Sequence, residues 1–448
     1  MVLTDRDRAE LHQSIVDYLI AQKCTVAAQV KAELMPEDKT SVRFASTESQ
    51  LERRWNTLRR LNAKVTELEA QNTQLQSELR ALQDPTVAKT KNKDMLPAEP
   101  SLHTFRGHRD SLTAVVFHPS DPLIYSSSED GSIRVWDLVN RSLVQTVKEH
   151  LDNVSSLALE PIEGKILASG SNDLTVKLFD AQSMECTRTL MGHDEPVTCV
   201  CWAQDERKTL ISGSRNGNIR VWDAQRGAQK ASLNNEGDWV RTISIMYPGS
   251  PMMATAGNNN VVNLWNWQSG QLTTQIGGIH ENYIQSVCFS NYEVDCVIIA
   301  NHGSADLKDM IKRHERTMRV NASTGQNGTA AAPSSSSGRP AGYEPRFIAS
   351  GARDKLIVIS DLVSKENVMT LGHHDNWVRQ LTFSANGKYI VSCSDDARVL
   401  IHDLATKRIH RKIAAHDHFV TCFAIHMGGK PLMVTGSADT TLKLWPCN

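Results

Sequence analysis

A repeating unit of 42 or 43 residues runs along most of this chain and constrains its fold more than any other feature. Six units open with an anchor histidine and the fourth has Glu236 in that slot, the histidines being His108, His150, His193, His280, His374 and His416. A turn residue recurs at the same interval, namely Asp130, Asp173, Asn216, Asn259, Asp354, Asp396 and Asp439. Units of about 40–45 residues that open with Gly-His and close with Trp-Asp, or variants of these pairs, are typical of four-stranded propeller blades. The chain is therefore expected to form seven blades.

The blades are expected to occupy residues 101–448 as one domain, because each sheet of a propeller packs on the next. Successive turn residues lie 43, 43, 43, 95, 42 and 43 positions apart, so the fifth unit carries an insertion of about fifty residues. A strand-like segment, Leu102 to Phe105, precedes the first Gly-His. The last unit stops soon after Trp445, so we expect this early strand to complete the last blade and close the ring.

Composition excludes several classes of function. The chain has 49 basic and 50 acidic residues among 448 and a formal charge of -1, which gives no support for binding nucleic acid or a membrane surface. Its nine cysteines form no CxxC pair, as expected for reduced thiols in the cytosol. No apolar run approaches the ~20 residues that span a bilayer, and the charged start, MVLTDRDRAE, is unlike a signal peptide.

Residues 6–36 have the pattern of two short helices, with Leu11, Ile15, Tyr18 and Leu19 on one face of the first. A helical pair this small buries too little apolar surface to be stable alone, so it is expected to dimerise. The pattern resembles the LisH dimerisation motif, which we assign to residues 6–39. The alternative is an ordinary helical hairpin packed on the rest of the protein.

A heptad pattern predicts a short parallel coiled coil over residues 50–83. Its a and d positions include Leu58, Leu61, Val65, Leu68, Asn72, Leu75, Leu79 and Leu82. A buried Asn at one a position favours two parallel strands in register, because the two amides satisfy each other only when aligned. A single solvated helix is the alternative. Residues 84–100, with three lysines and three prolines, are expected to be a flexible linker.

The insertion in the fifth unit is expected to cover about residues 295–346. Its first half is charged, with a helical pattern from Leu307 to Val320. Its second half, NASTGQNGTAAAPSSSSGRPAG, is of low complexity and is expected to be disordered.

The recurring His, Ser or Thr, Asp and Trp are expected to form a hydrogen-bonded chain across each sheet, in the first unit His108, Ser126, Asp130 and Trp136. The same residue types form catalytic triads, but repetition in nearly every unit indicates a packing device. The spacing His416-x-His418 and the pair His373-His374 lack the further ligands of a metal site. No Gly-rich phosphate loop is present. The sequence thus predicts no enzyme, no metal and no cofactor.

Function is then expected from a surface, and one face has unusual side chains. Trp239 and Trp377 stand just before their inner strands, where other units have Ser, Asn, Pro, Tyr or Phe. Two pairs of arginines are expected on the same face. Arg241 and Arg379 follow two residues after the tryptophans, and Arg215 and Arg353 stand just before the turn residue of their units. Trp and Arg often dominate protein interfaces, so these six residues predict a site for an acidic, partly apolar partner. The alternative is that each Trp packs across its blade and each Arg is solvated.

The order of a LisH-like motif, a short coiled coil, a linker and seven Trp-Asp units resembles the lissencephaly/NudF family of cytoplasmic dynein regulators over essentially the whole chain. The segments GHHDNWVRQLTFSANGKYIVSCSDDARVLIHDL and HDHFVTCFAIH also carry the resemblance, and the insertion resembles that of a fungal member. The resemblance implies a homodimer that binds the dynein motor domain through one propeller face. The family's motor contacts match here at Arg215, Arg241, Arg353 and Trp377, whereas a family lysine is replaced by Ala397.

The same resemblance implies a non-catalytic role in assembling active dynein for nuclear migration and microtubule-based transport. Implied partners are the dynein heavy chain, a NudE-type coiled-coil protein and, indirectly, dynactin and microtubules, with no nucleic acid and no membrane insertion. The implied location is the cytoplasm and cytoskeleton, at microtubule plus ends and spindle poles or centrosomes. Alternatives within related architectures are the regulatory subunit of a platelet-activating-factor acetylhydrolase and a scaffold of a corepressor or ubiquitin ligase.

Overall fold

The computed structural model describes residue 12 and residues 95–161, 163–203, 208–247, 249–302, 344–426 and 431–447. The chain divides into two compact units, Met1–Asn92 and Lys93–Asn448. The predicted LisH motif (6–39), the predicted coiled coil (50–83) and the dimerisation residues named above lie outside the described residues; only His12 is described, and it is helical. Within the described residues, no helix combines the length and the apolar character needed to cross a bilayer.

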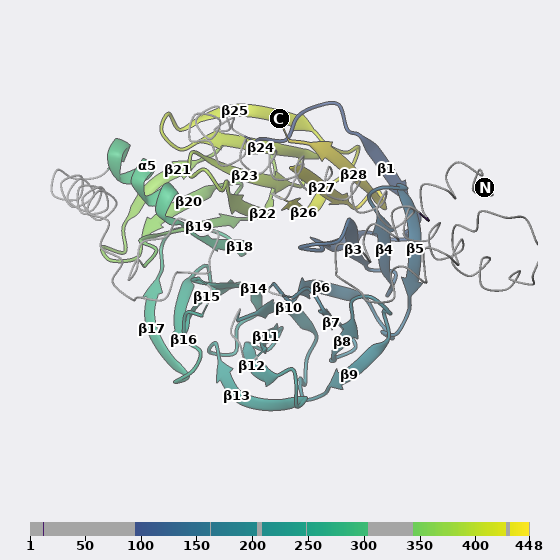
Figure 1. Cartoon of the computed structure of the whole chain (residues 1–448). Helices are drawn as coiled ribbons and strands as arrows, with labels where there is room; N and C mark the ends of the chain where they lie inside the picture. Colours follow the sequence, from purple (N-terminus) through teal and green to yellow (C-terminus); the bar gives the residue numbers. More distant parts are fainter. Residues whose placement is uncertain are drawn as a thin grey trace, which may run out of the picture. The chain divides into compact units, whose positions relative to one another are not determined.

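The second unit is a ring of seven four-stranded sheets, as the repeat predicts (Figure 1). Each sheet is antiparallel, and in six of the seven the strands follow each other in chain order from the inner to the outer strand. The second and third strands of each sheet lie between the two neighbouring blades and are covered on both faces. This explains why nearly every residue along strands such as β3, β11 and β23 is buried.

The first four blades occupy the stretch before the insertion. Blade 1 comprises β2 (Leu112–Phe117), β3 (Leu123–Ser128), β4 (Ile133–Asp137) and β5 (Ser142–Val147). Blade 2 comprises β6 (Val154–Leu159), β7 (Ile166–Ser171), β8 (Val176–Asp180) and β9 (Cys186–Leu190). Blade 3 comprises β10 (Val197–Trp202), β11 (Thr209–Ser214), β12 (Asn218–Asp223) and β13 (Ala228–Asn234). Blade 4 comprises β14 (Val240–Ile245), β15 (Met252–Gly257), β16 (Val262–Asn266) and β17 (Gln271–Ile276).

The remaining three blades include helix α5, which is inserted in blade 5. Blade 5 comprises β18 (Ile284–Phe289), helix α5 (Tyr292–His302), β19 (Phe347–Ala352), β20 (Ile357–Asp361) and β21 (Asn367–Leu371). Blade 6 comprises β22 (Val378–Phe383), β23 (Tyr389–Ser394), β24 (Arg398–Asp403) and β25 (Arg408–Ala414). Blade 7 comprises β26 (Val420–His426), β27 (Leu432–Ser437), β28 (Thr441–Pro446) and, as its outer strand, β1 (His103–Arg106).

The ring is closed by β1, which confirms the role expected for the early strand. It pairs antiparallel with β28, with His103 opposite Leu444 and Arg106 opposite Thr441. Phe105 is 2% exposed, and its ring lies 5.3 Å from that of Trp136 in blade 1. The closing strand therefore connects blade 7 to blade 1 through its backbone and through its side chains.

The end of the predicted flexible linker (84–100) is part of the propeller, so that prediction is wrong for its last residues. Leu96 is 2% exposed in the apolar core between blades 6 and 7, and Pro97 forms a β-bridge with Cys447. The backbone N–H of Ala98 donates to the Pro446 carbonyl at 2.9 Å. The Lys- and Pro-rich composition suggested a tether, because composition does not show that a single leucine, Leu96, packs into a core.

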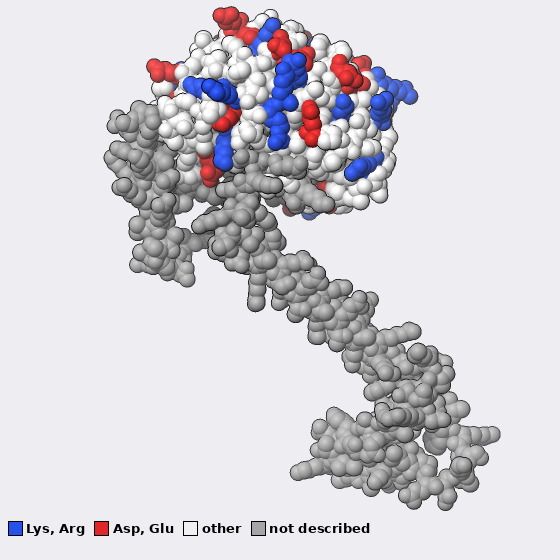
Figure 2. All heavy atoms as spheres, turned by 90° about the horizontal axis from the view of Figure 1, so that it is seen from above, with Lys and Arg blue, Asp and Glu red and all other residues white. Residues whose placement is uncertain are grey.

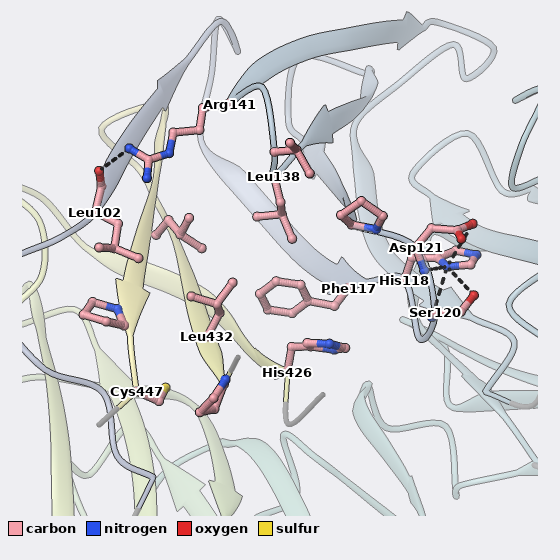
Figure 3. A pocket seen from close by; sticks show the side chains of 15 residues that line it. Leu102, Phe117, His118, Ser120, Asp121, Leu138, Arg141, His426, Leu432 and Cys447 are labelled. Atoms are coloured by element: carbon pink, nitrogen blue, oxygen red, sulfur yellow. Dashed lines mark hydrogen bonds and ion pairs between the residues drawn. The ribbon is translucent and has the colours of Figure 1, made fainter. Parts of the chain in front are cut away.

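A groove of about 770 Å³ lies at the seam between blades 1 and 7 (Figure 3). Phe117 and His426, the last residues of their inner strands, face each other across it with ring centroids 5.4 Å apart. Leu102 and Leu432 add apolar walls, and Arg141 lies at its edge and donates to the Leu102 carbonyl at 3.3 Å. Because it lies at the ends of the inner strands, the groove opens on the face opposite their beginnings.

The insertion in blade 5 begins with a helix, α5, which starts three residues before the predicted start near residue 295. In α5, Val294, Ile298 and Ile299 are buried against apolar residues of blades 5 and 6. Asp295 accepts a hydrogen bond from the Arg346 backbone at 2.9 Å, which joins the two ends of the insertion. Residues 303–343, with the expected helix from Leu307 and the low-complexity stretch, lie outside the described residues.

The hydrogen-bonded chain expected in the first unit is confirmed. His108 Nε2 lies 2.8 Å from Ser126 Oγ, His108 Nδ1 lies 3.2 Å from Asp130, and Trp136 Nε1 donates to Ser126 at 2.8 Å. The same contacts between an anchor histidine, a hydroxyl and a turn aspartate recur in blades 2, 5, 6 and 7. These groups are buried and hydrogen-bonded to each other, so they stabilise the sheets.

Blade 4 departs from this pattern at the anchor position. Glu236 keeps the spacing of the anchor histidines but is exposed, with a positive φ of 54°. The buried polar residue is its neighbour Asn235, which is 1% exposed and accepts a hydrogen bond from Asn263 at 2.5 Å.

Blade 6 departs from the hydrogen-bonded chain of blade 1 at the tryptophan, because His402 occupies the position of Trp136. His402 is fully buried, and neither ring nitrogen has a hydrogen-bond partner among the described residues. Its ring lies 5.1 Å from that of His373, which stands where blade 1 has Gly107. In blade 1 a Cβ on Gly107 would lie only 3.2 Å from the Trp136 ring. Compared with blade 1, blade 6 thus has a smaller ring, His402, in place of Trp136 and a larger residue, His373, in place of Gly107.

Candidate partner-binding face

The loops before the inner strands and the turns with the Asp residues lie on one face, as the sequence predicts. In blades 1 to 3 and 5 to 7, the residue before the inner strand accepts a backbone hydrogen bond from the residue before the turn, as Tyr283 does from Arg353 and Trp377 does from Asp395, both at 3.0 Å. The same bond joins Arg215 to Pro196 at 3.0 Å. These bonds fix the two sets of candidate side chains next to each other.

The six predicted site residues form one continuous row together with Tyr283. We call this row the Arg–aromatic strip, and it consists of Arg215, Trp239, Arg241, Tyr283, Arg353, Trp377 and Arg379. The guanidinium carbons of Arg215 and Arg241 lie 4.9 and 4.8 Å from the centroid of the Trp239 ring. Those of Arg353 and Arg379 lie 4.0 and 5.4 Å from the Trp377 ring. Each tryptophan is therefore placed between two arginines, at cation–π distance.

Tyr283 joins the two halves of the strip and was not among the predicted residues. Arg241 and Arg353 lie 5.5 and 5.3 Å from its ring, and the side chain is 38% exposed. It occupies in blade 5 the position that Trp239 and Trp377 occupy in blades 4 and 6. Its position in the repeat could have identified it, but a tyrosine there is less unusual than a tryptophan.

The strip is strongly cationic. Burial, followed by the charges of Arg353 and Arg379, lowers the pKa of Arg241 to about 10. Burial and the charge of Arg379 likewise lower the pKa of Arg353. The Nε of Arg215 is buried without a hydrogen-bond partner in the described part of the chain. Four guanidinium groups this close repel each other, and the Asp395 carboxylate beside Arg379 offsets part of that repulsion. An anionic partner would offset more of it.

Polar groups behind the strip hold three of the arginines in place. Arg379 donates to both carboxylate oxygens of Asp395, at 2.7 and 2.8 Å. Arg241 Nε donates to Asn258 Oδ1 at 2.6 Å. Gln285, in the amide orientation that satisfies both groups, accepts from Arg353 Nε at 2.6 Å. Because these arginines are already oriented, a partner does not have to order them on binding.

The second residue of the inner strand differs between the blades that carry most of the strip and the blades before them. In blades 1 and 2, a hydroxyl at the second position of the inner strand donates to the next blade, from Thr113 to Val154 and from Ser155 to Val197, both at 2.6 Å. Thr198 of blade 3 bonds to the Val240 carbonyl in the same way. In blades 4 to 6 this position is Arg241, Gln285 and Arg379. A position that joins blades in one part of the ring thus presents long polar side chains in another.

Ala397, where the family resemblance implies a lysine, lies in the turn that follows Asp395 and Asp396. Its φ is +65°, and the residue after the turn Asp or Asn has a positive φ in every blade, including Lys355 at 70°. A lysine is therefore compatible with this backbone conformation. The alanine removes the long cationic side chain from this position without requiring a different turn.

Comparison with known proteins agrees with this architecture. The WD domain, G-beta repeat family matches residues 99–137, 141–180, 184–223, 365–403 and 407–446. The nuclear distribution protein nudF of Aspergillus niger is 31% identical over 397 residues, which cover 87% of this chain and 82% of that protein. The nudF protein of Emericella nidulans is 32% identical, with 87% and 82% covered, and the nuclear distribution protein PAC1 of Coccidioides posadasii is 32% identical, with 87% and 79% covered. The chain therefore belongs to the family of the nuclear distribution proteins nudF and PAC1.

Proposed function

We propose that this protein is a non-catalytic regulator of nuclear distribution that binds the motor domain of cytoplasmic dynein through the Arg–aromatic strip. Membership of the nudF and PAC1 family supports the role in nuclear distribution. The observation that supports the strip as the contact is its geometry, with two tryptophans, a tyrosine and four oriented arginines in one row. Such a surface suits a partner that presents carboxylates beside apolar side chains.

The proposal includes a homodimer, formed by the LisH-like motif and the coiled coil, in which two propellers act on one motor. A NudE-type coiled-coil protein would be a second partner, and dynactin and microtubules would be reached indirectly. The place of action would be the cytoplasm and cytoskeleton, at microtubule plus ends and spindle poles. These assignments rest on the resemblance of the chain to its family and on the heptad pattern.

Replacing Arg241, Arg353 and Trp377 with Ala is expected to weaken binding to a purified dynein motor domain by at least about 100-fold. Central Trp and Arg residues of an interface often cost more than 2 kcal/mol each when truncated, and 1.4 kcal/mol corresponds to a factor of ten. Binding would be measured by interferometry with the motor immobilised, and folding by the thermal midpoint of the propeller.

The matched control replaces two exposed arginines and one exposed leucine on the outer rim, Arg188, Arg226 and Leu143, with Ala. It should bind the motor as the wild type does. Full affinity of the strip variant, at an unchanged thermal midpoint, would reject this face as the motor contact.

A chain that begins at Met95 is expected to be a folded monomer that binds the motor more weakly than the full chain. Residues 95–100 must be kept, because Leu96 belongs to the core and Ala98 bonds to β28. Joining two propellers raises the apparent affinity by ~10²–10⁴ where both can engage. The mass of each species would be measured by light scattering and the affinity by interferometry. Equal affinities of monomer and full chain on a two-headed motor would contradict the role of the dimer.

A further inference from the structure

The outer strand of blade 6, β25, carries far more positive charge than any other outer strand of the ring. The stretch from Lys407 to Lys412 reads KRIHRK, so four of its six residues are Lys or Arg. Every other outer strand in the described sheets has one such residue or none, Arg106 in β1, Arg188 in β9 and Lys230 in β13 being the ones present. Since the whole chain has a formal charge of -1, this concentration does not reflect an overall basic composition.

Three of the four charges of this stretch are exposed, and Asp403 lies opposite Arg408 on the neighbouring strand β24. Lys407, Arg408 and Lys412 are exposed and, among the described residues, form no ion pair. Arg411 donates to the backbone carbonyls of Leu96 and Pro97, at 3.2 and 2.6 Å, and these carry no charge. Figure 2 looks at the ring from the side on which β25 lies in Figure 1, and Lys and Arg side chains lie near the middle of that surface with Asp and Glu side chains beside them.

The outer backbone edge of β25 has no strand partner among the described residues, and its regular alternation is interrupted once, by a register shift between Ile409 and Arg411. β25 pairs with β24 on one side and is the last strand of its sheet. At its far end the backbone N–H of Ala414 donates to the carboxylate of Glu99, at 3.0 Å. Lys412 lies two residues earlier, so its backbone groups face the same edge. The carboxylate of Glu99, which lies in a bend before β1, thus already occupies one end of this edge.

We propose that β25 is a docking site for an acidic, extended polypeptide segment that adds a strand along residues Lys407–Lys412. Backbone hydrogen bonds to the free edge supply affinity in such strand addition. Alternating Glu or Asp side chains would pair with the exposed Lys and Arg across the two strands. The uncharged outer strands β5 and β17 offer an edge without the charge, so charge complementarity selects β25. This inference is independent of the motor contact proposed above.

The test uses the full-length protein and a fluorescent peptide of about ten residues in which Glu alternates with Thr, a length suited to one strand. Fluorescence anisotropy should show saturable binding that weakens at least about tenfold between about 50 mM and 500 mM salt, because exposed charges are screened. The triple variant Lys407→Glu, Arg408→Glu, Lys412→Glu should lose at least about tenfold in affinity.

A matched control applies the same change of charge elsewhere on the rim, with Lys148→Glu, Arg188→Glu and Arg226→Glu, all at exposed residues. It should bind the peptide within about twofold of the wild type. Equal losses in both triple variants would overturn the site, because they would show attraction to the overall charge alone. Both variants should keep the thermal midpoint of the wild type.

Two further probes separate strand addition from other modes. A peptide of the same sequence, N-methylated at every residue, has no backbone N–H on either edge, cannot form the backbone ladder and should bind at least about tenfold more weakly. Equal binding of the methylated peptide would overturn strand addition. Single-stranded RNA that binds through Lys407–Lys412 when the acidic peptide does not would overturn the assignment to a polypeptide.

Discussion

A chain that begins at Gly107, and therefore lacks β1, is expected to lose the cooperative thermal transition that a chain beginning at Met95 retains. Without β1, the edge of β28 is unpaired and the core between blades 7 and 1 loses Phe105. An open ring with a free apolar edge is prone to aggregate. Circular dichroism on heating and size-exclusion chromatography would measure the two chains side by side. Equal thermal midpoints would show that blade 7 is stable with three strands.

A point variant makes the same test quantitative. Phe105→Ala is expected to lower the free energy of unfolding by about 3–5 kcal/mol, the range for truncating a buried aromatic ring. Leu102→Ala changes the same segment at a side chain that is 41% exposed, and should cost less than about 1 kcal/mol. Similar costs for the two variants would mean that the backbone pairing of β1, and not its packing, holds the ring closed.

The double variant His373→Gly, His402→Trp is expected to be more stable than the wild type, most of all at acid pH. It recreates the pairing of Gly107 and Trp136 in blade 1, and the new indole N–H can donate to Ser392 as Trp136 does to Ser126. The change also removes two buried nitrogens that have no hydrogen-bond partner in the described structure. An unsatisfied buried polar group costs about 1–3 kcal/mol, so the gain at pH 7 should be of this size.

The pH dependence follows from the buried histidine. Burial, followed by the charges of His374 and His373, lowers the pKa of His402 from its ordinary 6.5 to about 3. The unfolded chain therefore binds a proton below pH 6.5 that the folded chain does not bind until about pH 3. Stability is full above pH 6.5 and falls as the pH drops through this window, by up to about 1.4 kcal/mol per pH unit.

Between pH 7 and 4.5 the double variant should therefore lose about 2–3 kcal/mol less than the wild type, measured by denaturant titration at each pH. Leu151→Ala changes an exposed side chain that does not titrate and should leave the wild-type pH dependence unchanged. The double variant keeps the acid sensitivity that comes from His108 and His193, whose pKa values burial lowers to about 4. If its pH dependence equalled that of the wild type, His402 would not contribute to acid unfolding.

The features that repeat in the sequence were predicted correctly. The spacing of His108, Asp130 and their equivalents gave seven blades and the buried hydrogen-bonded chain, and it placed Trp239 and Trp377 on one face. Periodicity works here because each blade repeats the same local contacts, so one well-understood unit explains the others.

The features that were missed depend on contacts between segments that are distant in the sequence. Leu96 belongs to the core only because the ends of the ring meet, and α5 packs on blade 6 as well as on its own blade. The cation–π contacts of Tyr283 and the pairing of Arg379 with Asp395 arise from the spacing of neighbouring loops. A pattern within one unit carries no information about such distances.

The pairing of β1 with β28 also has a consequence for synthesis on the ribosome. The first strand of the domain emerges more than three hundred residues before its partner, since β1 starts at His103 and β28 ends at Pro446. During that interval six blades can form while β1 and the first inner strand wait with exposed apolar surface. A chain that terminates early cannot cover this surface. Closure by the final strand thus makes completion of translation a condition for a soluble product, and incomplete chains would be recognisable to chaperones and proteases.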